Sequence, residues 1–262
     1  MNTIIKISRF YNRKLFPKIE HLRGATFLSR QLSKLALKTA NKEKNIEIDG
    51  LTLSNKIYDL DDKVARKVLT GLYEQDETKL IENLNPEVDV VELGGGIGYI
   101  SCLINSRISQ NNKHIVLEPN PEVIEIVRHN KDLNNASFEI QQKAYSHETK
   151  DVKLRIDDAA PFWGGSTYVE RKESKTKEVQ GVSLEEIVDN FELGDFTLVS
   201  DIEGGEFELL DEELDLISAK CSQAIIEFHT IEGSEIQHPI DKMKNEGFTQ
   251  IFQSNRVYSF KK

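Results

Sequence analysis

The stretch Val90-Val91-Glu92-Leu93-Gly94-Gly95-Gly96-Ile97-Gly98-Tyr99 predicts a buried strand that runs through a glycine turn into a helix. The apolar, mostly β-branched residues before Gly94 are typical of a parallel strand covered on both faces. Gly94, Gly96 and Gly98 stand at every second position, where a side chain would obstruct a ligand lying against the backbone or clash in a tight turn. In an open α/β sheet, ligands bind beside such a turn.

The spacing of these glycines distinguishes two kinds of ligand. A dinucleotide-binding turn has the spacing G-x-G-x-x-G, but here its third glycine would fall on Tyr99 or Ser101. The observed spacing is acidic-x-Gly-x-Gly-x-Gly, with Glu92 as the acidic residue. Glu92 could face a cation, and the glycines could leave room for an amino-acid moiety. The pattern resembles the first motif of S-adenosylmethionine-dependent methyltransferases. A glycine turn with no ligand is the weaker alternative, because three glycines after a buried strand weaken a fold.

The next two predicted strands end in residues suited to a nucleoside. Residues 114–118 (HIVLE) form an apolar strand that ends at Glu118. An acidic side chain in this place accepts hydrogen bonds from both hydroxyls of a ribose. Asn120 is expected to cap the helix that follows. Lys143 and Ala144 come at the end of the third strand, where a small residue such as Ala144 suits the flat face of a base.

Two later strands end in residues that can move a proton. Residues 196–201 (FTLVSD) end at Asp201, and residues 224–229 (AIIEFH) end at His229. Because the carboxyl ends of parallel strands meet at one edge of a sheet, we predict a catalytic group of His229, Asp201 and Glu203. His229 is the expected general base, and the two carboxylates would orient it or the acceptor. These residues could support Mg²⁺, but no spacing demands a metal and we expect none. A purely structural histidine is the alternative.

Composition limits the classes of protein to consider. The chain has 262 residues, of which 38% are hydrophobic, enough for one α/β domain with an extension. No segment approaches the roughly 18 apolar residues of a membrane span, and the first residues lack the apolar segment of a signal peptide. Cys102 and Cys221 are interpreted as buried thiols, which favours a reducing, cytoplasmic location.

The charge is distributed unevenly along the chain. Residues 1–44 contain eleven Lys and Arg against two acidic residues, a net charge of +9. The whole chain has 34 basic and 44 acidic residues, so the remainder has 23 against 42 and a net charge of −19. The acidic remainder argues against nucleic acid as a partner. The basic leader contains a helical stripe of Phe27, Leu28, Leu32 and Leu35. We expect residues 1–40 to pack on the protein's own body or on a second copy in a homo-oligomer, and contact with an anionic membrane is the alternative.

Weaker signals concern the connecting segments. Two alternating triplets around Asp49-Gly50 predict a β-hairpin. Asp61 or Asp62 is expected to cap a helix that ends near Gly71, and Asp76 to cap the next one. The loop after residue 156 contains Phe162 and Trp163 and is either an acceptor-binding lid or a packed surface loop. Residues 171–178 form a charged run, interpreted as a solvated loop, and a strand pair is predicted between residues 248 and 260.

Several separated motifs resemble those of the FkbM family of S-adenosylmethionine-dependent methyltransferases. These motifs are Tyr73-Glu74, residues 92–98, Glu118-Pro119-Asn120, residues 201–206 (DIEGGE) and residues 226–229 (IEFH). The resemblance covers about residues 70–260. It implies a Rossmann-like, doubly wound seven-stranded α/β sheet with a C-terminal antiparallel hairpin, and methyl transfer from S-adenosylmethionine, usually to oxygen and often on sugars or polyketides. The expected cofactor-binding residues are Glu92, Gly94, Gly96, Gly98, Tyr99, Glu118, Pro119, Asn120, Lys143, Ala144 and Asp201.

One departure from the family pattern stands in the glycine turn. The family usually begins this motif with Asp and has Ala-Asn between the glycines, where this chain has Glu92 and Gly95-Gly96. The turn therefore lacks a side chain that could contact the cofactor.

The sequence predicts a basic helical extension over residues 1–45 and a methyltransferase domain over residues 46–262. The expected reaction is transfer of a methyl group to a hydroxyl or carboxylate oxygen of a small molecule or glycan, with a sugar as the favoured acceptor. Two alternatives stay open: a non-catalytic S-adenosylmethionine- or nucleoside-binding module, and an NAD-dependent oxidoreductase, which the glycine spacing disfavours.

Overall fold

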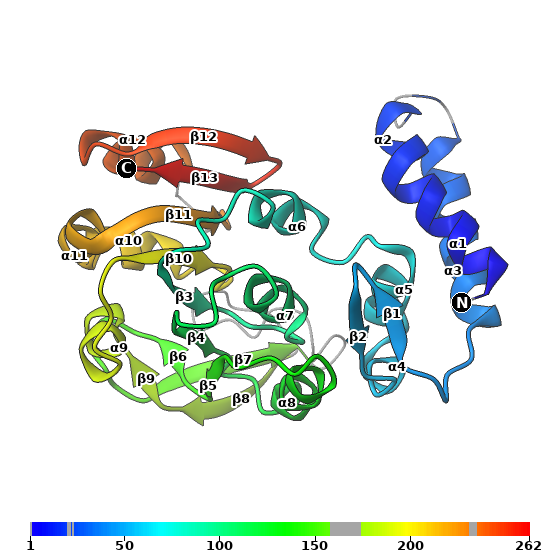
Figure 1. The fold of residues 1–262 in the computed structure, drawn as a ribbon, viewed down its shortest axis with the longest axis horizontal. Helices are drawn as coiled ribbons and strands as arrows, with labels where there is room; N and C mark the ends of the chain where they lie inside the picture. Colours follow the sequence, from blue (N-terminus) through cyan, green and yellow to red (C-terminus); the bar gives the residue numbers. More distant parts are fainter. Residues whose placement is uncertain (1, 20–21, 23, 158–173, 231–234) are drawn as a thin grey trace. The chain divides into compact units, whose positions relative to one another are not determined.

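The computed structural model describes residues 2–19, 22, 24–157, 174–230 and 235–262 (Figure 1). Contacts divide the chain into two compact units. The N-terminal unit comprises Met1–Gln75 with Asp132–Asn134, and the sheet unit comprises Asp76–Lys131 with Asn135–Lys262. The domain boundary predicted at residue 45 does not coincide with this division, because the hairpin and the two helices after it pack with the basic leader.

The N-terminal unit is mostly helical. Its elements are α1 (Thr3–Phe10), a π-helical turn η1 (Tyr11–Leu15), α2 (Phe16–Ile19), α3 (Ala25–Thr39), β1 (Ile46–Ile48), β2 (Leu51–Leu53), α4 (Ile57–Leu60) and α5 (Asp62–Thr70). The predicted hairpin is confirmed, and both turn residues, Asp49 and Gly50, have positive φ as a tight turn requires. Asp61 caps α5 by accepting hydrogen bonds from two backbone N–H groups, and Gly71 ends that helix with φ of 71°.

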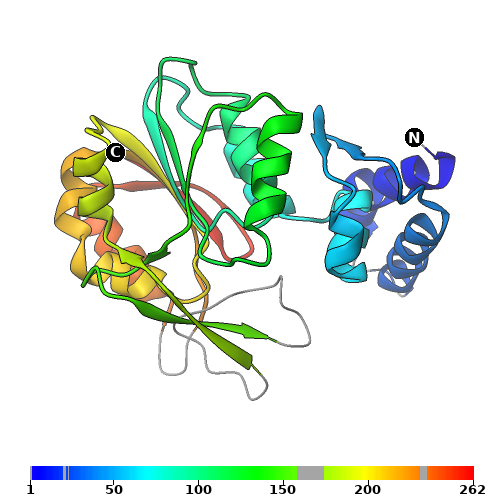
Figure 2. The same ribbon diagram turned by 90° about the horizontal axis from the view of Figure 1, so that it is seen from below.

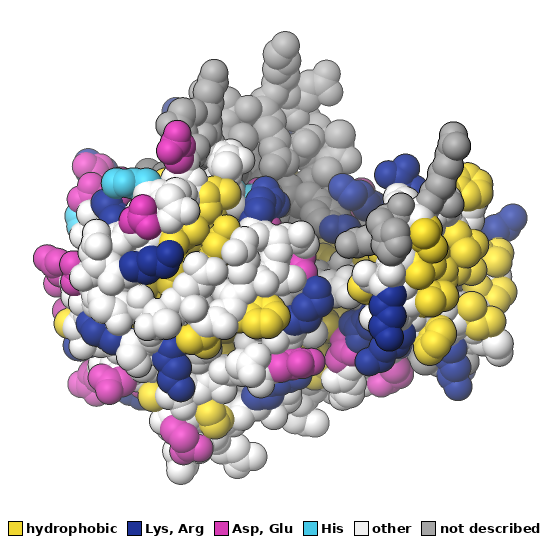
Figure 3. Space-filling view, turned by 90° about the horizontal axis from the view of Figure 1, so that it is seen from above, with side chains coloured by type: hydrophobic (Ala, Val, Ile, Leu, Met, Phe, Trp, Pro, Cys, Tyr) yellow, Lys and Arg dark blue, Asp and Glu magenta, His cyan; other side chains and the backbone are white. Residues whose placement is uncertain are grey.

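Helix α3 packs through small residues rather than through its apolar stripe. Its buried side chains are Ala25, Ser29, Ser33 and Ala36. The buried Asn12 side chain accepts a hydrogen bond from Ser29 and donates one to Ser33. Phe27 is 66% exposed, and Leu28 and Leu35 are also exposed. Figure 3 shows hydrophobic side chains gathered beside Lys and Arg side chains at one end of the view.

The sheet unit alternates strands and helices. Its elements are α6 (Gln75–Ile81), β3 (Asp89–Leu93), α7 (Tyr99–Asn105), β4 (His114–Leu117), α8 (Ile124–Leu133), β5 (Glu139–Gln141), β6 (Ala144–Tyr145), β7 (Val152–Asp157), β8 (Ser174–Val179), β9 (Gly181–Val182), α9 (Leu184–Asn190), β10 (Phe196–Ser200), α10 (Glu206–Glu212), α11 (Leu214–Lys220), β11 (Cys221–Glu227), α12 (Gln237–Asn245), β12 (Thr249–Ser254) and β13 (Val257–Lys261). The order of strands in the main sheet is β12-β13-β11-β10-β3-β4-β5.

This sheet confirms the predicted fold class. Strands β11, β10, β3, β4 and β5 are parallel, whereas β13 runs antiparallel to β11 and pairs with β12 in a C-terminal hairpin. Helices α7 and α8 lie on one face of the sheet and α9 to α12 on the other (Figure 2). Every residue of β10 is buried, as a doubly covered strand requires. From β3 the chain continues to β4 on one side, and β10 lies on the other, so the carboxyl ends of β3 and β10 form the switch point where ligands bind in such sheets.

Three local predictions need correction. Residues 174–178, predicted as part of a solvated loop, belong to β8, which pairs antiparallel with β7. Asp76 lies inside the first turn of α6, and its carboxylate accepts hydrogen bonds from Lys79, Ser254 and Asn255 instead of capping the helix. Helix α8 begins at Ile124, because Asn120 first closes a turn by accepting from the backbone N–H of Glu122.

The predicted lid residues Phe162 and Trp163 lie outside the described residues. Both cysteines are buried and free, as predicted. Within the described ranges, no helix has the length and hydrophobicity needed to cross a bilayer.

Candidate functional site

The glycine turn, residues 94–98 between β3 and α7, brings two backbone segments into direct contact. Gly94 has φ of +94°, and a Cβ atom there would stand 1.9 Å from the carbonyl oxygen of Asp201. Gly98 has φ of +77°, and its Cβ would press on Val127 of α8. At Gly95, a Cβ would stand 2.6 Å from Cγ1 of Val116. The departure from the family pattern at Gly95 therefore has a local reason, since a side chain there would need Val116 to move.

Glu118 connects the turn to the end of β4. Its Oε2 accepts a hydrogen bond from the backbone N–H of Gly96 at 2.6 Å, and its Oε1 accepts one from the N–H of Asn120 at 2.7 Å. The side chain is buried, and burial raises the pKa of the Glu118 carboxyl to about 7, although both backbone donors favour its charged form. Each oxygen keeps a lone pair for a further donor, such as a ribose hydroxyl.

The other predicted cofactor residues occupy different surroundings. Glu92 is 1% exposed; its Oε1 accepts from the Ser101 hydroxyl and its Oε2 lies 2.8 Å from Nε2 of His114. Its carboxylate is therefore held inside the protein. The hydroxyl of Tyr99 lies 3.5 Å from that of Thr78. The cofactor contacts of Glu92 and Tyr99 stay predictions.

Pro119, Lys143 and Ala144 lie near the ends of β4 and β5. The backbone N–H of Glu118 donates to the carbonyl of Gln141, the last residue of β5. Pro119 follows Glu118 and is half-buried, as is Lys143 just after β5. Ala144 is buried and pairs with Gly181 in a two-stranded sheet of β6 and β9. The carboxyl ends of β4 and β5 therefore lie side by side, and the cofactor contacts of Pro119, Lys143 and Ala144 stay predictions.

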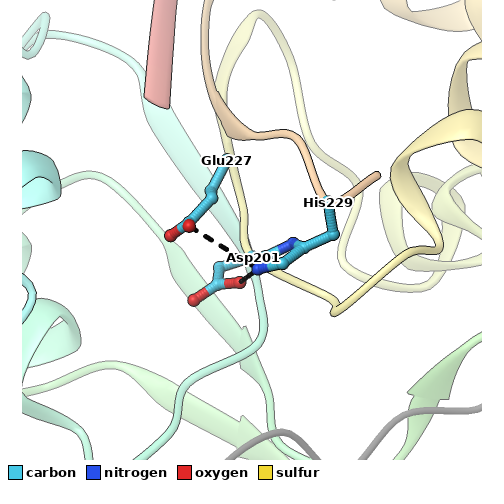
Figure 4. A group of neighbouring side chains, drawn as sticks. All are labelled: Asp201, Glu227 and His229. Atoms are coloured by element: carbon cyan, nitrogen blue, oxygen red, sulfur yellow. Dashed lines mark ion pairs between the residues drawn. The ribbon is translucent and has the colours of Figure 1, made fainter. Parts of the chain in front are cut away.

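A second group of side chains, the histidine cluster, gathers at the ends of β10 and β11. It consists of Asp201, Glu203, Glu206, Glu227 and His229. The structure brings together the three predicted catalytic residues, Asp201, Glu203 and His229, and adds Glu206 and Glu227. Figure 4 shows the imidazole of His229 lying beside Asp201 and Glu227.

Glu206 explains the shape of the loop between β10 and α10. Its Oε1 accepts from the backbone N–H of Ile202 at 3.0 Å, and its Oε2 accepts from that of Gly204 at 3.1 Å. Glu206 is fully buried, and its Oε1 also lies 3.3 Å from Nδ1 of His229. A hydrogen bond from Nδ1 to Glu206 fixes the orientation of the ring and leaves Nε2 facing the other carboxylates.

Three carboxylates surround Nε2 of His229. Its distance to Glu227 Oε1 is 3.5 Å, and its distances to Asp201 Oδ1 and Glu203 Oε2 are both 3.8 Å. Burial by itself would lower the pKa of His229, but the hydrogen bond to Glu206 and the charges of Asp201, Glu206 and Glu203 raise it to about 9. The imidazole consequently carries a proton at neutral pH.

Sequence reasoning had not assigned roles to Glu206, Glu227 and Arg256. Arg256 comes from the turn before β13 and donates to Glu227 Oε1 at 2.8 Å. Glu227 stands two residues before His229, so alternation along an extended chain would place both on one face. Glu206 opens α10, where a carboxylate beside free backbone N–H groups is favoured. These two signals were present in the sequence, whereas Arg256 offered none.

Comparisons with known proteins found one matching family and several similar solved structures. A sequence model described as "Methyltransferase FkbM domain" matches residues 92–258. No curated protein matches the sequence. Among solved structures, precorrin-6y C5,15-methyltransferase from Geobacter metallireducens GS-15 is similar with a TM-score of 0.41 and 14% identity, covering 83% of this chain and 95% of that one. An S-adenosylmethionine-dependent methyltransferase from Aquifex aeolicus gives 0.40 and 12%, covering 78% and 95%. Trm5 from Methanocaldococcus jannaschii in complex with adenosine gives 0.38 and 14%, covering 71% and 47%.

Proposed function

Since the chain belongs to the FkbM family of methyltransferases and uses S-adenosylmethionine, we propose that it methylates an oxygen atom, a hydroxyl or carboxylate of a small molecule or glycan. A sugar is the proposed acceptor, as the resemblance of its motifs to the family implies. The oxidoreductase alternative loses its support with this family assignment.

The residues of the glycine turn fit the cofactor. A Cβ at Gly94 would strike the backbone of Asp201, so glycine at this position lets the carboxyl ends of β3 and β10 approach closely at the switch point. Both oxygens of Glu118 accept hydrogen bonds from backbone N–H groups. These bonds fix the carboxylate, and its remaining lone pairs can accept from the two hydroxyls of a ribose. S-adenosylmethionine supplies a methyl group on a positively charged sulfur. The protein then has to align the acceptor oxygen with that methyl group and exclude water.

One observation supports oxygen as the acceptor atom: His229 pairs with buried Glu206 and lies beside Asp201. A hydroxyl loses its proton as it takes a methyl group, so a residue that receives the proton must stand nearby. His229 is the proposed base, with its ring held at Nδ1. Asp201 and Glu203 would hold the acceptor or the imidazole. Because His229 is charged at neutral pH, its own proton must leave before it can take another.

The proposed reaction is tested with S-adenosylmethionine that carries a deuterated methyl group. We expect the purified chain to form S-adenosylhomocysteine only when an acceptor with free hydroxyls is present, such as a mixture of sugars and glycans. Mass spectrometry should then place the label on oxygen. A label on nitrogen or carbon would contradict the proposal, and absence of S-adenosylhomocysteine with every acceptor would favour a non-catalytic binding module.

We propose in addition that the N-terminal unit docks on an anionic membrane, on the cytoplasmic side. Seven of the nine large hydrophobic side chains that are exposed among the described residues belong to this unit: Ile7, Phe10, Leu15, Leu22, Phe27, Leu28 and Leu35. They accompany the net charge of +9 on residues 1–44. Apolar side chains that insert and cations that face acidic headgroups are the two requirements for such docking.

Sedimentation with liposomes tests this docking. The intact chain should co-pellet with anionic vesicles, and less so at high salt as screening grows. Replacing Phe27 and Leu28 by serine should abolish binding. The matched control replaces Ile251 and Phe252, the exposed apolar pair of the sheet unit, and should bind normally. An intact chain that stays in the supernatant at low salt would exclude membrane docking, and a dimer in solution would then favour contact with a second copy.

A further inference from the structure

We infer that Asp201, Glu227 and His229 form a binding site for a divalent cation of the Mn²⁺ or Mg²⁺ type, and that the acceptor binds through this ion. One ligand atom from each of the three residues lies within 4.8 Å of the others. They come from the carboxyl ends of two neighbouring strands, β10 and β11 (Figure 4). The role of the acceptor in this inference rests on the proposed methylation of oxygen.

The buried imidazole of His229 is a second observation that indicates a ligand at this site. The residue is 9% exposed, and its Nε2 is aimed at the carboxylates. The nearest carboxylate oxygen, Glu227 Oε1, lies 3.5 Å from Nε2, whereas a charge-assisted hydrogen bond is about 2.7–2.9 Å long. Neighbouring ligands about 2.1 Å from an octahedral ion stand about 3 Å apart. Separations of 3.5–3.8 Å therefore need only a small closure around an ion.

Glu206 occupies the position of a supporting residue for a metal ligand. Metal-binding histidines usually donate their second ring N–H to a carboxylate, which fixes the ring and makes the first nitrogen a better ligand. Nδ1 of His229 meets buried Glu206 in this way, and two backbone N–H groups hold Glu206 in turn. Nε2 is thereby left as the nitrogen available to an ion.

The charge of the site favours a cation. Four carboxylates of the histidine cluster are opposed by the single ring of His229 and by the guanidinium of Arg256, which donates to Glu227 Oε1. Partly buried carboxylates are costly unless they are paired or bind a metal. A divalent ion would balance the excess negative charge of these carboxylates.

The ligand types also suggest how an acceptor would bind. Carboxylate oxygens with one imidazole suit Mg²⁺ or Mn²⁺. Three protein ligands leave about three positions of an octahedral ion, enough for two neighbouring hydroxyls of a sugar. A hydroxyl bound to such an ion loses its proton more readily. When the ion occupies Nε2 of His229, the Glu203 carboxylate takes over the role of base. The acceptor oxygen gives its proton to Glu203 and takes the methyl group, and the sulfonium becomes a neutral thioether.

Binding of Mn²⁺ to the full chain tests this site, with cofactor and acceptor both left out. Calorimetry should find one Mn²⁺ per chain, and pulsed electron paramagnetic resonance should detect a nitrogen ligand. In Glu227→Gln and His229→Gln, affinity should fall at least tenfold, and the nitrogen signal should vanish in the histidine variant. The matched control is His147→Ala, because His147 also lies between two carboxylates, 3.9 Å from Glu212 and 4.0 Å from Glu213. It should bind Mn²⁺ normally.

Circular dichroism checks that each variant folds, and a variant that does not fold is replaced by Asp201→Asn. Mn²⁺ should raise the melting temperature of the intact chain and of His147→Ala, but not of Glu227→Gln. Equal Mn²⁺ affinity in all of these chains, or no binding by the intact chain, would overturn the inference. A chain that binds Mn²⁺ as expected but methylates nitrogen would refute the proposed function and leave the cation site standing.

Discussion

The glycine turn and the histidine cluster both place carboxylates at the ends of parallel strands, but they hold them by different means. In the glycine turn, both oxygens of Glu118 accept hydrogen bonds from backbone N–H groups. In the histidine cluster, three carboxylates surround one nitrogen of a protonated imidazole. The first arrangement is fixed by the course of the backbone and suits an invariable ligand, the cofactor. The second can be rearranged by a proton or a cation, which suits chemistry on an acceptor.

A substitution at Gly94 is expected to have the largest effect, because Gly94 belongs to the glycine turn and lies against the backbone of Asp201 in the histidine cluster. In Gly94→Ala, the new Cβ would meet the carbonyl oxygen of Asp201 at 1.9 Å, at a φ of +94°. Positive φ alone costs a non-glycine residue of order 1–3 kcal/mol, and the two backbones must also separate. We expect a clear fall in melting temperature together with loss of S-adenosylmethionine binding and of activity.

Gly194→Ala is the matched control, since an added Cβ there meets no atom within 4 Å. Thermal unfolding and calorimetry should find it close to the unmodified chain. If Gly94→Ala melts normally and binds the cofactor, the contact between the turn and Asp201 is not needed for either region.

Substitution of His229 should lower turnover and leave cofactor binding almost unchanged. In His229→Ala, we expect turnover to fall by roughly 10²–10⁴, the usual contribution of a group that manages a proton, while the dissociation constant of S-adenosylmethionine stays within about twofold. The same pattern is expected for Asp201→Asn. Steady-state kinetics and calorimetry on the same preparations measure both quantities. His147→Ala, which alters a histidine outside the cluster, should change neither, and near-normal turnover in His229→Ala would remove this residue from the reaction.

Substitution of Glu118 should weaken cofactor binding and leave turnover almost unchanged. Glu118→Ala loses charge-assisted hydrogen bonds to the cofactor, so affinity should fall by about 1–3 kcal/mol, or roughly 5- to 150-fold. Turnover at saturating S-adenosylmethionine should change far less. Calorimetry and the dependence of rate on cofactor concentration test this, with Glu122→Ala as the control because its side chain is exposed. Unchanged affinity in the Glu118 variant would exclude Glu118 from the cofactor site.

The two regions also differ in how far their sequences reveal them. The glycine turn was predicted in detail because its signal is local: an apolar run, alternating glycines, and an acid at the end of the next strand. The histidine cluster was predicted only in part, since the contact between Glu206 and His229 joins residues 23 positions apart. Periodicity and spacing cannot report a contact of that kind, and the cation site can be inferred only once the side chains are placed.

Other errors have equally specific causes. Strand β8 was missed because Lys175, Lys177 and Glu178 are typical of solvated loops, whereas pairing with β7 decides the conformation. The cofactor contact of Glu92 stays a prediction. Its carboxylate also has partners inside the protein, Ser101 and His114, and the spacing along the chain did not indicate them. The apolar stripe of α3 lies on a helix as predicted, but the small residues Ala25, Ser29, Ser33 and Ala36 are the ones that are buried.

The smallest expected effect is a dependence of cofactor affinity on pH that arises from the glycine turn. Burial raises the pKa of Glu118 to about 7, so the carboxyl is mostly protonated at pH 6 and mostly ionised at pH 8. Ribose hydroxyls donate to the ionised form. If only that form binds, the apparent affinity for S-adenosylmethionine should rise about tenfold from pH 6 to pH 8. His229, with a pKa of about 9, stays largely charged over this range and should contribute little.

The stability of the cofactor-free chain should move in the opposite direction. A carboxyl whose pKa is raised on folding favours the folded state below its unfolded value of about 4.5, and that contribution is lost as the pH rises toward 7. Comparing thermal unfolding of the unmodified chain with that of Glu118→Gln, which cannot ionise, isolates this term: the unmodified chain should lose stability relative to the variant between pH 5 and pH 7. Calorimetry at pH 6, 7 and 8 completes the test, because the rise in affinity should disappear in the variant. If affinity rises equally in both chains, another group controls cofactor binding, and the carboxylate held by the backbone is not the part of the site that senses pH.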